Sequence, residues 1–122
     1  MVNGIKQIYR TLSDASIIGI EYGIIKHEES TKFISINIIC FNWQTENWDN
    51  LKLIFNNVTF FRFIEGNETQ STIIFEALIK VDSEQIIVDF FPIQVDGLGI
   101  LAEDPNSSFA IKCTELTYEV LK

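Results

Sequence analysis

The sequence offers few residues that could carry out covalent chemistry. It holds one histidine, His27, and two cysteines, Cys40 and Cys113. Nucleophilic hydrolases need a base beside the nucleophile, whereas His27 stands in a charged turn with no serine or cysteine suitably placed. A zinc site needs several Cys and His residues at short spacing, which this chain does not supply. We therefore expect no catalytic residue, no metal and no cofactor.

Carboxylates are the remaining candidates for chemistry. Asp89 lies within the apolar segment Ile86-Ile87-Val88-Asp89-Phe90-Phe91, and burial there would suit it to acid–base catalysis. Strand alternation could equally place Asp89 on a solvent-facing side, where it would only aid solubility. Glu21 and Glu76 share this ambiguity. The sequence leaves both interpretations open.

Acidic residues dominate the charge of the chain. Seventeen Asp and Glu stand against nine Lys and Arg, a formal net charge of −8. Residues 1–61 carry a net charge of −1 and residues 62–122 carry −7. Nucleic acid would repel such a chain, which also lacks a basic stripe. The surplus either keeps a small β protein soluble, or it forms an acidic face that speeds association with a basic protein partner.

The residues predicted to contact such a partner lie in a long loop, at a hairpin tip and beside a polar loop. Tryptophan is a frequent interface anchor, and Trp43 and Trp48 bracket the polar loop 44–47. The predicted partner-binding residues are Glu65, Glu68, Asp96, Glu103, Asp104 and Trp48.

Hydrophobic periodicity predicts a mainly β protein. Short alternating segments joined by polar turns, without helices between them, favour an antiparallel β-sandwich or small barrel of about six to eight strands. We expect one domain, 1–122, with a β core in 17–122 and a helix or arm in 1–14, where residues 5–12 have helical spacing. No apolar run of about 18 residues or export signal is seen, so we expect a cytoplasmic chain with no membrane contact.

Four local features give sharper expectations. The first strand should be half-buried, with Ile18, Ile20, Tyr22 and Ile24 on one face, and the second should have Ile34, Ile36, Ile38 and Cys40 on one face. The apolar parity of residues 109–121 changes near Thr114-Glu115, which predicts a β-bulge. The run Phe60-Phe61-Arg62-Phe63 favours a strand covered on both faces, with the N-terminal helix as one candidate cover. Cys40 and Cys113 should be buried and reduced, although the sequence does not fix whether they pair.

Residues 48–63 read Trp48-Asp49-Asn50-Leu51-Lys52-Leu53-Ile54-Phe55-Asn56-Asn57-Val58-Thr59-Phe60-Phe61-Arg62-Phe63. With its apolar pattern, Trp48 and Val58, this block resembles the middle of small bacterial all-β proteins, some classed as immunity proteins of polymorphic toxin systems. The resemblance covers residues 45–122 and carries over no functional residue. It implies a cytoplasmic, non-catalytic protein, monomer or homodimer, that covers a toxin. A binder of small apolar ligands and a self-associating structural subunit are the alternatives.

Overall fold

The computed structural model describes residues 2–25, 31–64, 73–95 and 100–121. This part of the chain is mainly β, as predicted, with one short N-terminal helix. The elements are α1 (Val2–Tyr9), β1 (Ala15–Ile25), β2 (Thr31–Asn42), β3 (Asn47–Asn56), β4 (Phe60–Phe63), β5 (Ile73–Ile74), β6 (Leu78–Asp82), β7 (Gln85–Asp89), β8 (Ile93–Val95), β9 (Ile100–Ala102), β10 (Phe109–Cys113) and β11 (Glu115–Leu121).

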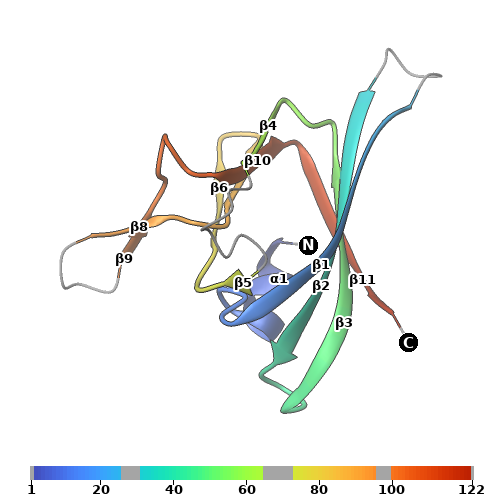
Figure 1. Ribbon diagram of the computed structural model, residues 1–122, viewed down its shortest axis with the longest axis vertical. Helices are drawn as coiled ribbons and strands as arrows, with labels where there is room; N and C mark the ends of the chain where they lie inside the picture. Colours follow the sequence, from blue (N-terminus) through green and yellow to red (C-terminus); the bar gives the residue numbers. More distant parts are fainter. Residues whose placement is uncertain (1, 26–30, 65–72, 96–99, 122) are drawn as a thin grey trace.

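The strands form two large antiparallel sheets and one small hairpin. Sheet A has the order β11-β3-β2-β1-β5, sheet B has the order β4-β10-β7-β6, and β8 pairs with β9. Sheets A and B pack in a sandwich-like arrangement, and α1 contacts strands of both (Figure 1). The described strands outnumber the six to eight expected, because the predicted last strand is divided in two and the long loop contains β8 and β9.

A single hydrophobic cluster joins the helix to both large sheets. The prediction for the second strand is confirmed, since Ile34, Ile36, Ile38 and Cys40 of β2 are fully buried. Their neighbours across the ladder, including Leu51 and Phe55 of β3, are buried as well. The alternation of period two in these central strands therefore reflects one covered and one open face.

The prediction for the first strand is confirmed for Ile20, Tyr22 and Ile24, which share one face, but not for Ile18, which lies in a bulge. Ile18, Ile20, Tyr22 and Ile24 are between 36% and 54% exposed. A register shift between Ile17 and Gly19 marks a β-bulge, and Ile17 is buried. Beyond the bulge, β1 and β2 project away from sheet B (Figure 1), so β4 covers the apolar side of β1 only in part, through the stacking of Tyr22 on Phe61.

The apolar side chains do change parity near Thr114, but they do so because the chain passes from sheet B to sheet A at this point. Strand β10 pairs with β4 and β7 in sheet B, whereas β11 pairs with β3 in sheet A. The bend at Thr114 lets Cys113 and Leu116, on opposite parities, both reach the core. A crossing between two sheets explains the pattern that we attributed to a bulge within one strand.

Coverage of the Phe60-Phe61-Arg62-Phe63 run on both faces is also not observed. Its strand, β4, is an edge of sheet B. Phe61 and Phe63 pack toward Phe109, with ring centroids 6.4 and 4.9 Å apart. Phe60 has the opposite parity and is 37% exposed. The Nζ atom of Lys112 lies 5.4 Å from its ring centroid, so a cation flanks this aromatic in place of a second layer.

Candidate protein-interaction site

The turn between β2 and β3 is the most tightly held exposed feature of sheet A. Asn42 organises it: its Oδ1 accepts the backbone N–H groups of Gln44 and Thr45 at 2.9 and 3.0 Å. The N–H of Glu46 donates to the Asn42 carbonyl at 2.8 Å, and Glu46 has a left-handed φ of 60°. An asparagine that bonds the next backbone donors is a common way to fix a short polar turn.

Helix α1 fixes the same turn from inside the molecule. The Tyr9 hydroxyl donates to Asp49 Oδ2 at 2.8 Å, and Asn42 Nδ2 donates to the same oxygen at 2.9 Å. The backbone N–H of Trp43 donates to the Ile8 carbonyl at 2.9 Å. Burial and then the hydrogen bond to the Asp49 carboxylate raise the pKa of Tyr9 well above its usual value of 10, so the phenol remains a donor at neutral pH.

This support presents three aromatic side chains, which we call the tip cluster: Phe41, Trp43 and Trp48. Phe41 is half-buried between the two tryptophans, with edge-on contacts at centroid distances of 4.9 and 5.5 Å. Trp43 is 42% exposed and Trp48 is 56% exposed. The Arg10 guanidinium carbon lies 4.1 Å from a Trp43 ring centroid. Rigid, exposed aromatics can bury a large apolar area at a small entropic cost.

The outer face of sheet A extends from the tip cluster and is acidic. Three exposed carboxylates project from it, Glu21 on β1 and Glu115 and Glu119 on β11. Lys52 on β3, opposite Glu119, is the basic residue that the described strands place on this face. Aromatic anchors and surplus carboxylates thus share one side of the molecule.

A hollow of about 220 Å³ lies within this acidic face, lined in part by Gly19, Glu21, Ser35, Asn37 and Lys52. The Oδ1 atom of Asn37 is buried there and has no hydrogen-bond partner among the described residues. A buried acceptor without a partner costs free energy, and it is satisfied when a donor enters the site. With Glu21 beside it, the hollow suits a cationic or amide donor.

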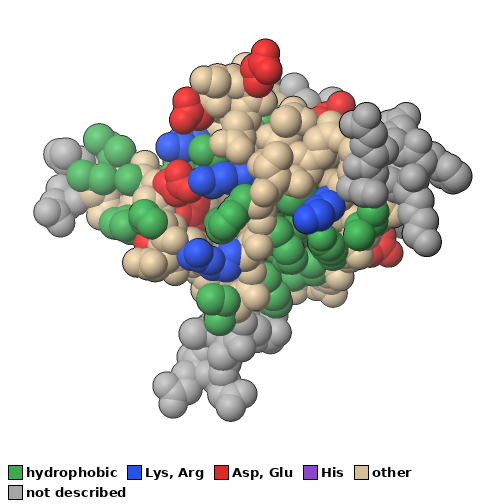
Figure 2. All heavy atoms as spheres, turned by 90° about the horizontal axis from the view of Figure 1, so that it is seen from above, with side chains coloured by type: hydrophobic (Ala, Val, Ile, Leu, Met, Phe, Trp, Pro, Cys, Tyr) green, Lys and Arg blue, Asp and Glu red, His purple; other side chains and the backbone are tan. Residues whose placement is uncertain are grey.

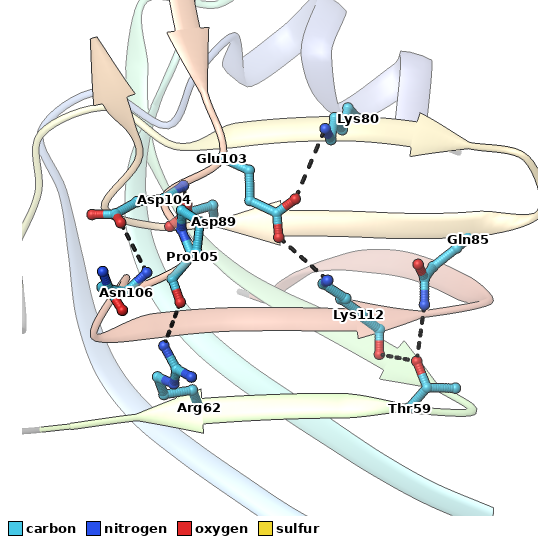
Figure 3. A network of polar contacts seen from close by, with 10 residues as sticks. All are labelled: Thr59, Arg62, Lys80, Gln85, Asp89, Glu103, Asp104, Pro105, Asn106 and Lys112. Carbon is cyan, nitrogen blue, oxygen red and sulfur yellow. Dashed lines mark hydrogen bonds and ion pairs between the residues drawn. The ribbon is translucent and has the colours of Figure 1, made fainter.

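Of the five acidic residues predicted to bind a partner, the structure describes two, Glu103 and Asp104. Glu65, Glu68 and Asp96 lie outside the described residues. Glu103 crosses the outer side of sheet B, where its carboxylate pairs with Lys112 at 3.4 Å and Lys80 at 3.9 Å (Figure 3). Asp104 Oδ1 accepts the Asn106 N–H at 2.9 Å. Glu103 is therefore neutralised by two lysines, so the surface around it is not the free acidic patch that we predicted.

Trp48 is exposed and lies in sheet A, whereas Glu103 and Asp104 follow β9, and Glu103 contacts Lys80 and Lys112 of sheet B. The structure therefore does not bring the described members of the predicted site together. The outer side of sheet B carries basic side chains instead. Figure 2 shows Lys and Arg side chains next to Asp and Glu side chains on one face of the molecule. Arg62 Nη1 donates to the Pro105 carbonyl at 2.7 Å (Figure 3).

Asp89 is fully buried, which resolves the two interpretations of that residue. Its Oδ1 accepts the Phe91 N–H at 3.0 Å and its Oδ2 accepts the Asp104 N–H at 2.8 Å. Both oxygens are thus engaged by the two ends of the segment that carries β8 and β9. This geometry makes Asp89 an anchor for that segment.

Sequence analysis missed Phe41, Arg10 and the acidic face of sheet A. The two tryptophans around one polar loop were a usable signal for the tip cluster, because a hairpin turn brings such residues close. Arg10 and Trp43 meet only because α1 packs under the turn. Glu21 and Glu119 share a face only through the strand order, which no local sequence pattern indicates.

A mostly apolar surface hollow provides a weaker basis for function. Its volume is about 270 Å³, and Phe75, Phe90, Phe91 and Leu101 are among the residues that line it. It is smaller than typical small-molecule pockets of about 300–1,000 Å³, and Phe75 in its wall is 68% exposed. The described ranges contain no group of three or more His, Cys, Asp or Glu residues placed to hold a metal ion. They also contain no helix with the length and apolarity needed to cross a membrane.

Comparisons with known proteins do not add a relationship. No family model, curated protein or solved structure matches the chain. The resemblance to immunity proteins therefore stays a prediction from the sequence.

Proposed function

We propose that this chain is a non-enzymatic protein-binding module whose outer sheet A face contacts a basic protein partner. The observation that carries the proposal is the tip cluster, in which Trp43 and Trp48 are exposed yet held by hydrogen bonds from α1 and Asn42. Exposed tryptophans that are fixed before binding are typical energetic centres of protein interfaces.

The basic character of the partner follows from charge. The chain has a net charge of −8, and Glu21, Glu115 and Glu119 face the same side as the tip cluster. Complementary potential accelerates encounter and orients the partner. The hollow beside Glu21, lined in part by Asn37 and Lys52, offers room for a side chain of the partner. Neutralisation of a toxin in the cytoplasm is the form of this function that the sequence resemblance suggests.

Affinity capture from the native cell, followed by binding measurements with the purified partner, tests the proposal. Trp43→Ala with Trp48→Ala should raise the dissociation constant by about 30-fold or more, the effect of losing a hot spot of about 2 kcal/mol. Glu21→Lys with Glu119→Lys should slow association and weaken its dependence on salt.

Phe75→Ala is the matched control, because Phe75 is an aromatic residue that is 68% exposed outside sheet A's outer face. A partner retained equally by wild type, the tryptophan variant and this control would refute the assignment of the tip cluster. Failure of a fully folded wild-type protein to retain any partner would count against the proposed function as a whole.

A further inference from the structure

Strand β1 has a long open edge. On one side it pairs with β2 along nearly its whole length, whereas on the other side β5 pairs only with Ala15 and Ser16. Within the described ranges, the edge from residue 17 to residue 25 has no neighbouring strand. Alternate N–H and C=O groups along such an edge point outward and can pair with another strand.

The usual protection of an open edge is sparse here. Natural edges carry lysine, proline, inward charges or closely spaced bulges. Residues 19–25 contain no Lys, Arg or Pro, and Glu21 is their one charged residue. The bulge at Ile18 lies at the start of this stretch. Seven residues of regular strand remain, which is a typical length for a paired strand.

The same stretch exposes apolar side chains on the inner side of sheet A. Ile20 is 36%, Tyr22 45% and Ile24 53% exposed, and their ladder partners show that they share one face. The Tyr22 ring stacks on Phe61 of β4 with centroids 6.0 Å apart, so it is held in position. Figure 2, which looks onto this end of the molecule, shows hydrophobic side chains gathered at the surface.

The order of residues along the edge is close to symmetric. It reads Ile18-Gly19-Ile20-Glu21-Tyr22-Gly23-Ile24, and its symmetry is centred on Glu21, where residues of like size would pair but the two Glu21 side chains would meet. Pairing about Tyr22 places Ile20 opposite Ile24, and each Glu21 opposite the Gly23 of the other copy. Apolar chains then meet across the pair, whereas pairing about Glu21 would oppose two carboxylates. An isologous interface requires this kind of self-complementarity.

We propose that β1 pairs antiparallel with β1 of a second copy about a twofold axis at Tyr22, joining two copies of sheet A into one continuous sheet. This dimer goes beyond the proposed partner-binding function, because it uses the strand edge and the inner apolar side and not the tip cluster, although both surfaces include Glu21. Each copy carries a net charge of −8, so the two copies repel one another and salt should strengthen their association.

Sedimentation equilibrium across protein concentration tests the dimer. Tyr22→Lys should raise the dimer dissociation constant at least about 100-fold, because it places a charge on the edge and removes the apolar contact. The matched control is Val120→Lys on β11, the opposite edge of sheet A, where Val120 is 46% exposed against 45% for Tyr22. Thermal melting of both variants checks that each still folds.

Disulfide trapping tests the register. Directly opposed residues of an antiparallel pair have Cβ atoms about 4.5–5.5 Å apart, close enough for a disulfide after a small adjustment. Tyr22→Cys should give a covalent dimer under mild oxidation, and Glu21→Cys should not. Trapping through Glu21→Cys alone would overturn the Tyr22 register.

Amide hydrogen exchange separates the second copy from other occupants of the edge. Alternate amides in residues 19–25 should become protected as protein concentration rises. Protection that is already complete at the lowest concentration would show that another part of the same chain occupies the edge, which overturns the proposal. A monomer at all concentrations, association that weakens with salt, or a dimer lost only in Val120→Lys would overturn it as well.

Discussion

Replacing Asp89 by asparagine gives a direct test of how the β8–β9 segment is held against sheet B. The Asp89 carboxylate is fully buried and accepts two backbone N–H groups, from Phe91 at 3.0 Å and Asp104 at 2.8 Å. In Asp89→Asn one side-chain position is an NH₂ group, which faces one of these donors and cannot accept from it. One charge-assisted bond is therefore lost and one buried N–H is left without an acceptor.

The size of the effect follows from these two losses. A hydrogen bond to a charged group contributes about 1.5–3 kcal/mol, and an unsatisfied buried donor costs about 1–3 kcal/mol. The lost hydrogen bond and the unsatisfied donor overlap, because both arise from the same broken contact. We therefore expect the free energy of unfolding to fall by about 3 kcal/mol. At about 2.1 cal/mol/K per residue, the unfolding entropy of 122 residues is about 0.26 kcal/mol/K. The melting temperature should therefore fall by about 12 °C.

Asp104→Asn is the matched control for this prediction. It makes the same chemical change on the partner segment, but Asp104 Oδ1 bonds the Asn106 N–H at an exposed position, and asparagine keeps that acceptor. We expect a change below about 0.5 kcal/mol. Calorimetry gives the stability of each variant, and hydrogen exchange should show faster Phe91 and Asp104 amides in Asp89→Asn only. Equal melting temperatures for the two variants would refute the anchoring role of Asp89.

Two further predictions concern buried polar groups. Burial raises the pKa of Cys40 to about 12 and that of Cys113 to about 11, from 9.0, so thiolate formation disfavours the folded state. The free energy of unfolding should stay constant below pH 9 and fall as the pH rises from about 9 toward 12. Denaturant melts of the double variant Cys40→Ala/Cys113→Ala should show a smaller fall over this pH range. An equal dependence of the unfolding free energy on pH in the wild type and the variant would contradict the reasoning. Tyr9→Phe removes the donor to Asp49 and should cost about 1.5 kcal/mol while speeding exchange of the Trp43 amide. Tyr118→Phe is its control, because the Tyr118 hydroxyl has no hydrogen-bond partner among the described residues, and equal losses in the two variants would argue against a role for the Tyr9–Asp49 bond.

Local periodicity was sufficient to predict the fold class and the central strands. Each of Ile34, Ile36 and Ile38 lies in a strand with neighbours on both sides and a covered inner face, so alternation and burial coincide. In β1 the same alternation predicted the shared face of Ile20, Tyr22 and Ile24 but not their exposure, since a strand can be amphipathic without a complete opposing layer. Whether sheet B reaches over Ile20 and Tyr22 depends on the length and placement of β4, which no local pattern contains.

The candidate site was only partly predictable for a related reason. Trp43 and Trp48 are five residues apart, and a hairpin turn brings them together, so their pairing could be expected from the sequence. Arg10 reaches Trp43 across 33 positions of the chain, through the packing of α1 beneath the turn. Contacts of that kind depend on the tertiary arrangement, not on local spacing.

The acidic surface was predicted in the wrong part of the molecule, because antiparallel strand pairing brings together charged residues that are distant in the sequence. Along the chain, residues 81–111 contain no Lys or Arg, and this gap suggested a free acidic patch. In sheet B, however, both lysines that bound the gap, Lys80 and Lys112, pair with Ile87 from opposite sides. Strand spacing alone then places the two lysine positions about 10 Å apart, with room for Glu103 between them. Three carboxylates for which the described residues show no ion pair, Glu21, Glu115 and Glu119, come from two distant stretches of the sequence but share the outer face of sheet A. A protein partner would therefore meet an acidic surface assembled by the strand order, and not the most acidic stretch of the chain.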